Sequence, residues 1–138
     1  MTSPELERLE QIGSLMREPP LSGEVKGLQH SGEARLVDAT NSELSIESRF
    51  DLAYNAGHAL ALAALRRMGY RPRNRYIVFQ VLTHTLSIPA AKWRVLAKAH
   101  DLRNRTEYEG ALNLDERLVE DMIAAVTAVR DALRAATT

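Results

Sequence analysis

Arginine, asparagine and tyrosine side chains that could bind and process a phosphate gather in the segment RNRTEYEG, residues 103–110. The guanidinium of Arg103 is a rigid fork of donors that matches two phosphate oxygens. Asn104 adds donors and an acceptor beside it, and the phenol of Tyr108 can donate a hydrogen bond or, less readily, exchange a proton. These residue types predict a phosphate site built on Arg103, Asn104 and Tyr108.

The helix expected before this segment would place the site at the edge of the core. Arg103 lies one helical turn from His100 and one turn from Glu107, so the three share a face with the apolar residues before them. A guanidinium held at such a border is well placed to clamp a phosphate. The residues that could support the site are His100, Glu107 and Arg105.

A structural alternative explains the same residues without any ligand. Arg103 could pair with Glu107, while Asn104 caps a turn and Tyr108 packs on the last helix. Pairs of opposite charge four residues apart are common on helices. Both interpretations stay open at this point.

The charge is distributed unevenly along a chain whose net charge is zero. Residues 1–65 hold 5 basic and 10 acidic side chains, and residues 106–138 hold 3 basic and 7 acidic ones. Residues 66–105 hold 10 basic side chains against Asp101 alone. This basic middle third favours a polyanionic partner, and the alternative is that its charges solvate several unrelated faces. The sequence does not say whether they form one surface.

Several kinds of chemistry are excluded or not expected. The 138 residues contain no cysteine, so disulfides and Cys-ligated metal sites are excluded. They contain no GxxxxGK[ST] or GxGxxG phosphate loop, no HExxH motif and no Glu-x-x-His pair. We therefore expect no metal and no cofactor.

The acidic N-terminus lacks a signal-peptide pattern, and no apolar run approaches the roughly 20 residues of a membrane span. We expect a cytoplasmic protein with no membrane partner.

The apolar pattern is helical throughout, and no alternating run predicts a strand. A helix begins at Ser3-Pro4, and two prolines and three glycines predict a loop at 17–32. The stripe of the first helix comprises Leu6, Leu9, Ile12 and Met16. Further helices are predicted at 33–39, at 43–69, at 75–86, from Ser87-Ile88-Pro89 to about Gly110, and over the last section.

Two of these helices carry apolar seams of the kind found in helical bundles. The seam at 43–69 comprises Phe50, Tyr54, Gly57, Ala61, Ala64 and Met68, and the seam of the last helix comprises Val119, Met122, Val126, Val129 and Leu133. Gly57 should let a neighbouring helix approach closely. We predict an all-α fold, an antiparallel up-and-down bundle of four to five helices with an N-terminal helical extension. Residues 1–42 would form the extension and residues 43–138 the bundle, within a single compact domain.

The pairing of RFDLAYNAGHALALAALRRMGYRP, residues 49–72, with LRNRTEYEG, residues 102–110, resembles HEPN domains, the higher eukaryotes and prokaryotes nucleotide-binding family. The resemblance spans roughly 44–135. It implies an up-and-down bundle of four or five helices, usually a homodimer. Many HEPN proteins are toxins of toxin–antitoxin systems that cleave RNA without a metal. Others lack ribonuclease activity and act as partners of small nucleotidyltransferases.

The family's ribonuclease motif is an arginine and a histidine separated by four to six residues, the first often asparagine. The resemblance aligns Arg103 with the arginine and Asn104 with the residue after it. The histidine position then falls on Tyr108, Glu109 or Gly110, so this chain departs from the motif. An ordinary tyrosine has a pKa near 10 and is a weaker base at neutral pH than histidine. Glu107 or His100 could take over the role.

The sequence therefore leaves two functions open. In the first, the protein binds RNA or nucleotide phosphates through Arg103 and Asn104, as part of a toxin–antitoxin or nucleotidyltransferase-associated system. Such a protein could also be an atypical metal-independent endoribonuclease. In the second, it is a non-catalytic helical dimerisation or adaptor module that docks a nucleotidyltransferase or antitoxin. Whether it is an enzyme is left undecided.

Overall fold

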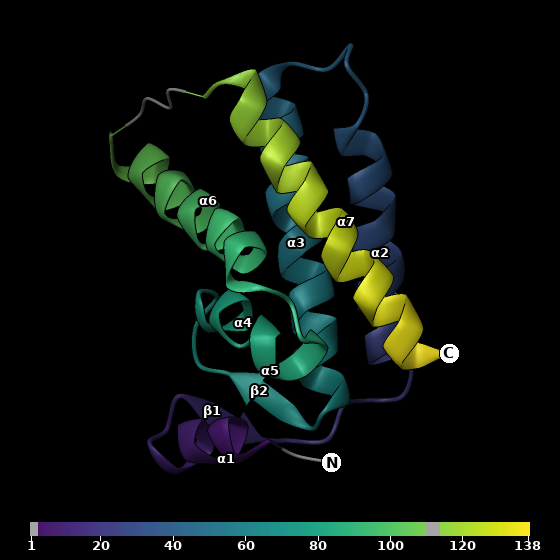
Figure 1. The fold of residues 1–138 in the computed structure, drawn as a ribbon, viewed down its shortest axis with the longest axis vertical. Coiled ribbons are helices and arrows are strands. Elements are labelled where there is room, and N and C mark those ends of the chain that lie inside the picture. The colour runs from purple at the N-terminus through teal and green to yellow at the C-terminus, as the bar shows by residue number, and fades with distance from the viewer. Residues whose placement is uncertain (1–2, 110–113) are drawn as a thin grey trace.

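The computed structural model describes residues 3–109 and 114–138, apart from the side chains of 106–109. Within these residues the chain forms an all-α helical bundle with one small sheet (Figure 1). The elements are α1 (Pro4–Gln11), β1 (Leu15–Arg17), α2 (Glu24–Ala39), α3 (Ile46–Arg67), β2 (Tyr70–Pro72), α4 (Ile77–Gln80), α5 (Leu82–Leu86), α6 (Ala90–Glu109) and α7 (Glu116–Thr137). The predicted fold class is confirmed.

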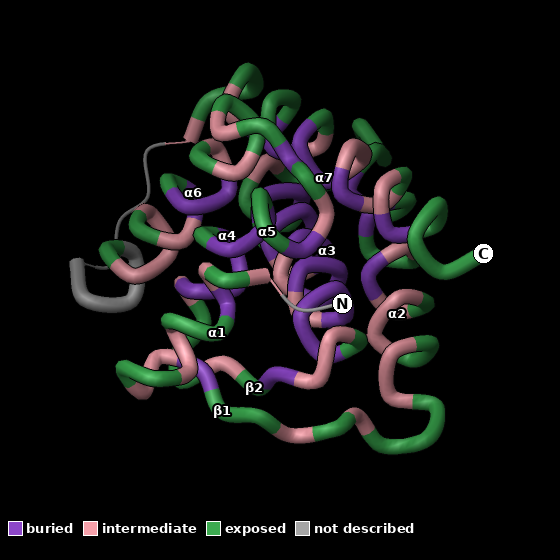
Figure 2. Tube along the Cα trace, turned by 60° about the horizontal axis from the view of Figure 1, so that its bottom comes forward, coloured by how far each residue is buried: buried purple, intermediate pink, exposed green. Residues whose placement is uncertain are grey.

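Helix α3 is the centre of the bundle. It packs against α2 and α7 along one side, while α4, α5 and α6 cover the other (Figure 1). Its residues are buried on almost every turn, as the tube coloured by burial shows (Figure 2). Both predicted seams are buried, apart from Met68, which is half-buried. A helix that is apolar on most faces can be stable only when neighbours surround it.

Gly57 provides the close approach that the sequence predicts. A Cβ added there would lie 3.1 Å from Val126 Cγ2 of α7 and 3.4 Å from Leu96 Cδ2 of α6. The glycine costs roughly 1 kcal/mol of helix propensity relative to alanine. In return, it lets α3 contact two neighbouring helices at one point.

The loop predicted at 17–32 is wrong from residue 24 onward, because α2 begins at Glu24. Pro19 and Pro20 do precede the helix, and Gly23 adopts a left-handed φ of 80° just before it. Gly32 lies inside α2, where a Cβ would come within 2.6 Å of Leu60 Cγ. That glycine marks close packing of α2 on α3, and the sequence interpretation took it for a turn signal.

The prediction of no strands is also wrong, because β1 and β2 pair antiparallel. Each strand has only three residues, too few to show an alternating pattern. The pairing joins the N-terminal segment to the turn after α3, and Arg17 Nη2 reinforces it by donating to the Tyr70 hydroxyl at 3.0 Å.

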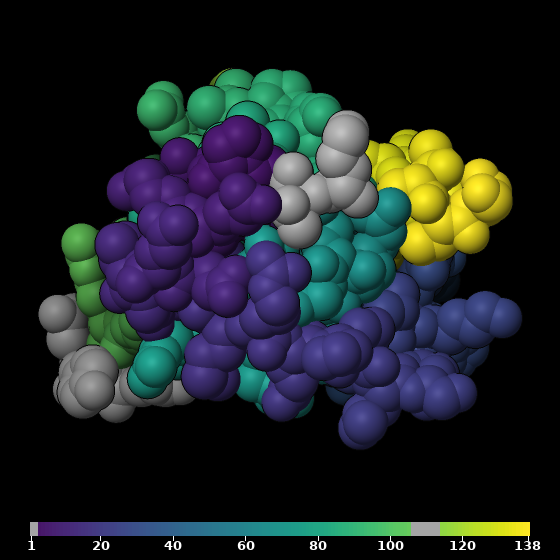
Figure 3. All heavy atoms as spheres, turned by 90° about the horizontal axis from the view of Figure 1, so that it is seen from below, coloured from purple at the N-terminus to yellow at the C-terminus, as the bar shows by residue number. Residues whose placement is uncertain are grey.

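The apolar stripe predicted for the first helix ends early, since Ile12 is 63% exposed. Figure 3 shows the N-terminal segment spread over this end of the molecule.

The helix predicted at 75–86 is divided at Val81 into α4 and α5. A straight helix cannot turn consecutive positions toward one core, because neighbours point about 100° apart. The break lets α4 pack on α6 and α5 pack on α7. The apolar residues buried by this arrangement are Ile77, Val78, Phe79, Val81 and Leu82.

Candidate functional site

The side chain of His100 lies between α6 and α3 and makes two hydrogen-bonding contacts. Its Nδ1 is 2.9 Å from the hydroxyl of Tyr54, and its Nε2 is 3.1 Å from the amide nitrogen of Asn104. An amide nitrogen can only donate, so Nε2 accepts and the ring proton is on Nδ1. That proton is donated to the Tyr54 oxygen. His100 is thus held as a neutral imidazole whose Nε2 lone pair is engaged by a neighbour on its own helix.

Two arginines from different elements lie over the ring of Tyr54. The guanidinium carbon of Arg103, in α6, is 5.0 Å from the ring centroid, and that of Arg75, before α4, is 5.8 Å from it. Tyr54 itself is fully buried in α3. A cation over an aromatic face gains about 0.5–2 kcal/mol, more when water is excluded. The two positive charges are therefore held at the border of the core.

His58, one turn after Tyr54 on α3, completes the cluster. It is half-buried, and its ring is 6.2 Å from that of Phe79. Burial lowers the pKa of His58 to about 4, helped by the charges of Arg75 and Arg103. The ring is therefore neutral at physiological pH. A neutral imidazole keeps one donor and one acceptor without adding to the positive charge.

The resulting site, which we call the α3–α4–α6 cluster, combines two cations, two imidazoles, a phenol and an amide. Its members are Tyr54, His58, Arg75, His100, Arg103 and Asn104. Aromatic rings pack around His100, with centroids 5.4 Å away for Tyr76 and 6.3 Å away for Phe79. These rings fix the orientation of the imidazole. Donors, cations and a possible base are therefore brought together at one place.

The structure brings together some of the predicted site residues and not others. His100, Arg103 and Asn104 lie in the cluster, on one face of α6 as their spacing predicts. Arg105 is exposed and has no contact with the cluster among the described side chains. The side chains of Glu107 and Tyr108 lie outside the described residues, so their predicted roles stay predictions.

Sequence reasoning missed the half of the site that comes from outside α6. The sequence places Tyr54 on the bundle seam and Arg75 in the basic stretch, and its spacing gives His58 no role. One signal was present for Tyr54, because a phenol on a buried seam needs a partner for its hydroxyl. Nothing in the spacing named that partner as His100.

Not every charge of the basic middle third reaches the surface. Arg66 is only 1% exposed and all five of its N–H groups donate to neighbours. Nε and Nη2 reach the Glu24 carboxylate at 2.8 and 3.2 Å, and the carbonyls of Glu18, Pro19 and Tyr70 take the rest. The pairing lowers the pKa of Glu24 to about 2. Arg66 is therefore engaged within the protein and keeps no N–H donor for a ligand.

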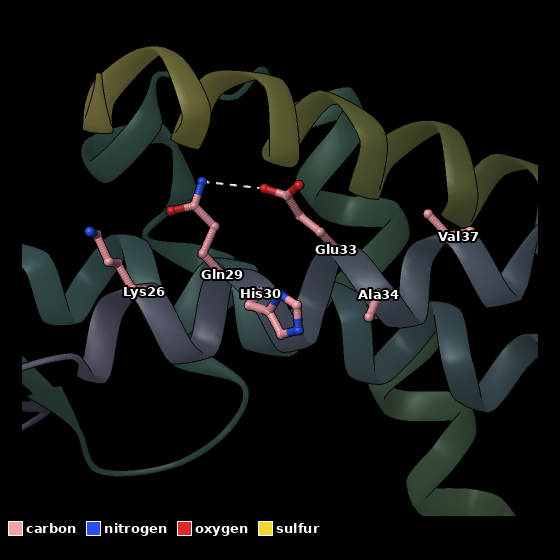
Figure 4. A pocket seen from close by; sticks show the side chains of 6 residues that line it. All are labelled: Lys26, Gln29, His30, Glu33, Ala34 and Val37. Atoms are coloured by element: carbon pink, nitrogen blue, oxygen red, sulfur yellow. Dashed lines mark hydrogen bonds between the residues drawn. The ribbon is translucent and has the colours of Figure 1, made fainter.

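A hollow of about 540 Å³ on the outer face of α2 is less suited to chemistry (Figure 4). All the side chains that line it come from this one helix, and Gln29 donates to Glu33 across it at 3.3 Å. Glu33 is in turn paired with Arg134 of α7. Glu33 is thus engaged by Gln29 and Arg134, and no lining groups from different elements converge there.

Comparison of the chain with protein-family models, curated proteins and solved structures finds no match. Among the described residues, no group of three or more His, Cys, Asp or Glu side chains could hold a metal ion. In the same part of the chain, no helix is long and apolar enough to cross a membrane. The α3–α4–α6 cluster is therefore interpreted from its own geometry.

Proposed function

We propose that the α3–α4–α6 cluster binds the phosphates of RNA or of a nucleotide in an HEPN-like protein. One observation supports this most strongly: Arg75 and Arg103, which come from different elements, both lie over Tyr54 beside two imidazoles. Two guanidiniums that lie 5.0 and 5.8 Å from the centroid of the same ring, with the half-buried His58 one turn along α3, create a positive potential. A phosphate that enters this field gains charge-assisted hydrogen bonds.

The same groups suggest a second candidate function, metal-independent RNA cleavage. His100 carries its proton on Nδ1, which leaves Nε2 as the basic nitrogen. A substrate 2′-OH that displaced the Asn104 amide could give its proton to Nε2 while its oxygen attacked the phosphorus. The 5′ oxygen would leave with a proton from water, and Arg103 would stabilise the charge on the phosphorane. His100 is one of the two residues, with Glu107, that the sequence offers in place of the motif histidine.

The biological setting rests on the family resemblance. We propose a toxin–antitoxin or nucleotidyltransferase-associated system, with a homodimer as the working form. The alternative is a non-catalytic adaptor whose cluster only stabilises the bundle. An adaptor would bind its partner protein equally well with or without the two arginines.

The test is RNA binding and cleavage by the purified protein in the presence of a metal chelator. Fluorescence anisotropy with a labelled single-stranded RNA is compared for the parent and for Arg103→Ala, Arg75→Ala and Arg94→Ala. Arg94 is an exposed arginine of α6 that lies over Trp93, so its substitution is a matched control for lost charge. Cleavage of total RNA by the same proteins and by His100→Gln is followed on gels.

We expect Arg103→Ala and Arg75→Ala each to weaken binding by about tenfold or more, as loss of a charge-assisted hydrogen bond does. Arg94→Ala should change it little. If cleavage occurs, His100→Gln should slow it by about 10²–10⁴-fold. Equal binding by the Arg103, Arg75 and Arg94 variants would remove the cluster from RNA recognition.

A further inference from the structure

A basic pocket adjoins the α3–α4–α6 cluster and shares His58 and Arg75 with it. The pocket has a volume of about 260 Å³ and lies between α3, the start of α2 and the segment that follows β2. This is smaller than the roughly 300–1,000 Å³ of sites that enclose a whole small molecule. It fits a ligand group better than a complete ligand. Its lining includes the guanidiniums of Arg66, Arg71, Arg73 and Arg75, together with His58 and Asn74.

Strand geometry explains why the arginines of the RPRNR run meet at this pocket. Arg71 lies in β2 and Arg73 follows two positions later, so their side chains leave the backbone on the same face. The backbone at Arg73 is fixed, because its N–H donates to the carbonyl of Ser14 at 3.2 Å. Asn74 is also held, since its side-chain oxygen accepts from the N–H of Ile77 at 3.0 Å. That orientation leaves the donor end of the Asn74 amide for a ligand.

The charges around the pocket do not cancel. Of its four guanidiniums, Arg66 is paired with Glu24, and Arg71 is paired with Glu18 at 2.5 Å. Arg73 and Arg75 make no ion pair with a carboxylate in the described part of the chain, so two positive charges are left over. The wall residue His58 is neutral and can donate a hydrogen bond to an anion. A surplus of two charges matches a phosphate monoester, which carries about −1.5 to −2 at pH 7.

We propose that this pocket binds a terminal phosphate monoester, with Arg73 and Arg75 as its main contacts. The inference rests on the proposed function and deepens it, because it names the phosphate that is recognised. A phosphodiester within the RNA chain would lie at Arg103, and a 5′-terminal phosphate would enter the pocket. Arg75 lines both places. The protein would then prefer RNA with a 5′-phosphate over RNA with a 5′-hydroxyl.

The experiment compares two 2′-O-methyl oligoribonucleotides that differ only at the 5′ end, phosphate against hydroxyl. The methyl groups prevent cleavage, so binding is measured alone. The proteins are the parent, Arg73→Ala, Arg73→Lys and Arg35→Ala. Arg35 is an exposed arginine on α2 and serves as the control for lost charge. Titration of a nucleoside 5′-monophosphate by calorimetry distinguishes a free nucleotide from an RNA end as the source of the phosphate.

We expect the parent and Arg35→Ala to bind the 5′-phosphate form about tenfold to a hundredfold more tightly. Arg73→Ala should abolish that preference, and Arg73→Lys should keep part of it because the charge remains without the fork. Arg73 is exposed, so both variants should fold, and equal circular dichroism checks this. Equal binding of the two oligonucleotides by the parent, or a preference that survives in Arg73→Ala, overturns the proposal.

The outcome is separable from that of the proposed function. If Arg103→Ala weakens both oligonucleotides equally and the 5′ end makes no difference, the cluster binds RNA and the pocket does not. If a monophosphate binds in an Arg73-dependent manner while Arg103→Ala leaves RNA binding intact, the pocket proposal stands and the proposed function fails.

Discussion

The middle and the C-terminal end of helix α3 hold arginines in opposite ways. At the C-terminal end, Arg66 is buried, and every donor of its guanidinium is used by Glu24 or by backbone carbonyls. Eight to twelve residues earlier, at His58 and Tyr54 in the middle of the helix, the arginines come from other segments and lie over a phenol and beside imidazoles. The C-terminal end is a closed structural network, and the middle is suited to a ligand.

This difference shows that a count of basic residues is a poor guide to a binding surface. Arg66 and Arg75 belong to the same basic stretch of the sequence. What separates them is whether carboxylates and carbonyls of the protein already satisfy the guanidinium. Substitutions and pH changes can test whether the middle and the C-terminal end of α3 differ in this respect.

The largest effect is expected at the closed end. Arg66→Ala should lower the free energy of unfolding by about 3–5 kcal/mol, because removing one partner leaves Glu24 and several carbonyls without their donors. Arg71→Ala is the matched control, since Arg71 pairs with Glu18 near the same place but both side chains are 46% exposed. It should cost at most about 1 kcal/mol. Urea denaturation measures both, and equal losses would contradict the structural role of Arg66.

Acid should destabilise the middle of α3, around His58, before it affects the Arg66–Glu24 pair at the C-terminal end. The pKa of His58 is lowered from 6.5 to about 4, so between these values the unfolded chain takes up a proton that the folded chain does not. The free energy of unfolding therefore decreases as pH falls below 6.5, and His58 has no such effect above that pH. The pKa of Glu24 is lowered from 4.5 to about 2, so the stability from its pairing is present above pH 4.5 and is lost only as pH falls below that value.

Unfolding measured at pH 7 and pH 4.5 tests this order. The parent should lose about 2–3 kcal/mol more than His58→Gln over that interval, by the usual 1.36 kcal/mol for each pKa unit. His30→Gln is the control, because His30 is exposed on α2. An identical pH dependence for the parent and His58→Gln would show that the environment of His58 is not the one described here.

A smaller effect is expected midway along α3, where α2 packs against Leu60. In Gly32→Ala the new Cβ would lie 2.6 Å from Leu60 Cγ and 3.2 Å from the Ala56 carbonyl oxygen. We expect a net loss of about 1–2 kcal/mol despite the gain in helix propensity. Gly27→Ala, on the same helix with no atom within 4 Å of the new Cβ, should instead gain about 0.5–1 kcal/mol. If thermal unfolding showed that both substitutions stabilise the protein, or that both destabilise it, the close packing at Gly32 would be refuted.

The sequence predicted the parts of the molecule that depend on local periodicity. The long helices follow from apolar spacing, and so does the shared face of His100 and Arg103 on α6, because residues three apart lie together on any helix. Helix α2 was misjudged in part because its glycines have different roles. Gly23 adopts a turn conformation, whereas Gly32 leaves room for the side chain of Leu60.

The parts that depend on packing could not be predicted in this way. Tyr54 meets His100 across 46 residues of chain, and Arg66 meets Glu24 across 42. No spacing rule connects such residues, because their proximity results from how the helices pack. The same limit hid the pocket beside β2, whose arginines were visible in the sequence but whose pairing with Glu18 and Glu24 was not.

The most direct test of the phosphate site is the response of its two imidazoles to RNA. The ring signals of His58 and His100 are followed by nuclear magnetic resonance while a 2′-O-methyl oligoribonucleotide is added. We predict that both rings shift and that the pKa of His58 rises from about 4, because a bound phosphate offsets the charges of Arg75 and Arg103. RNA binding that leaves both rings and the pKa of His58 unchanged would contradict the account.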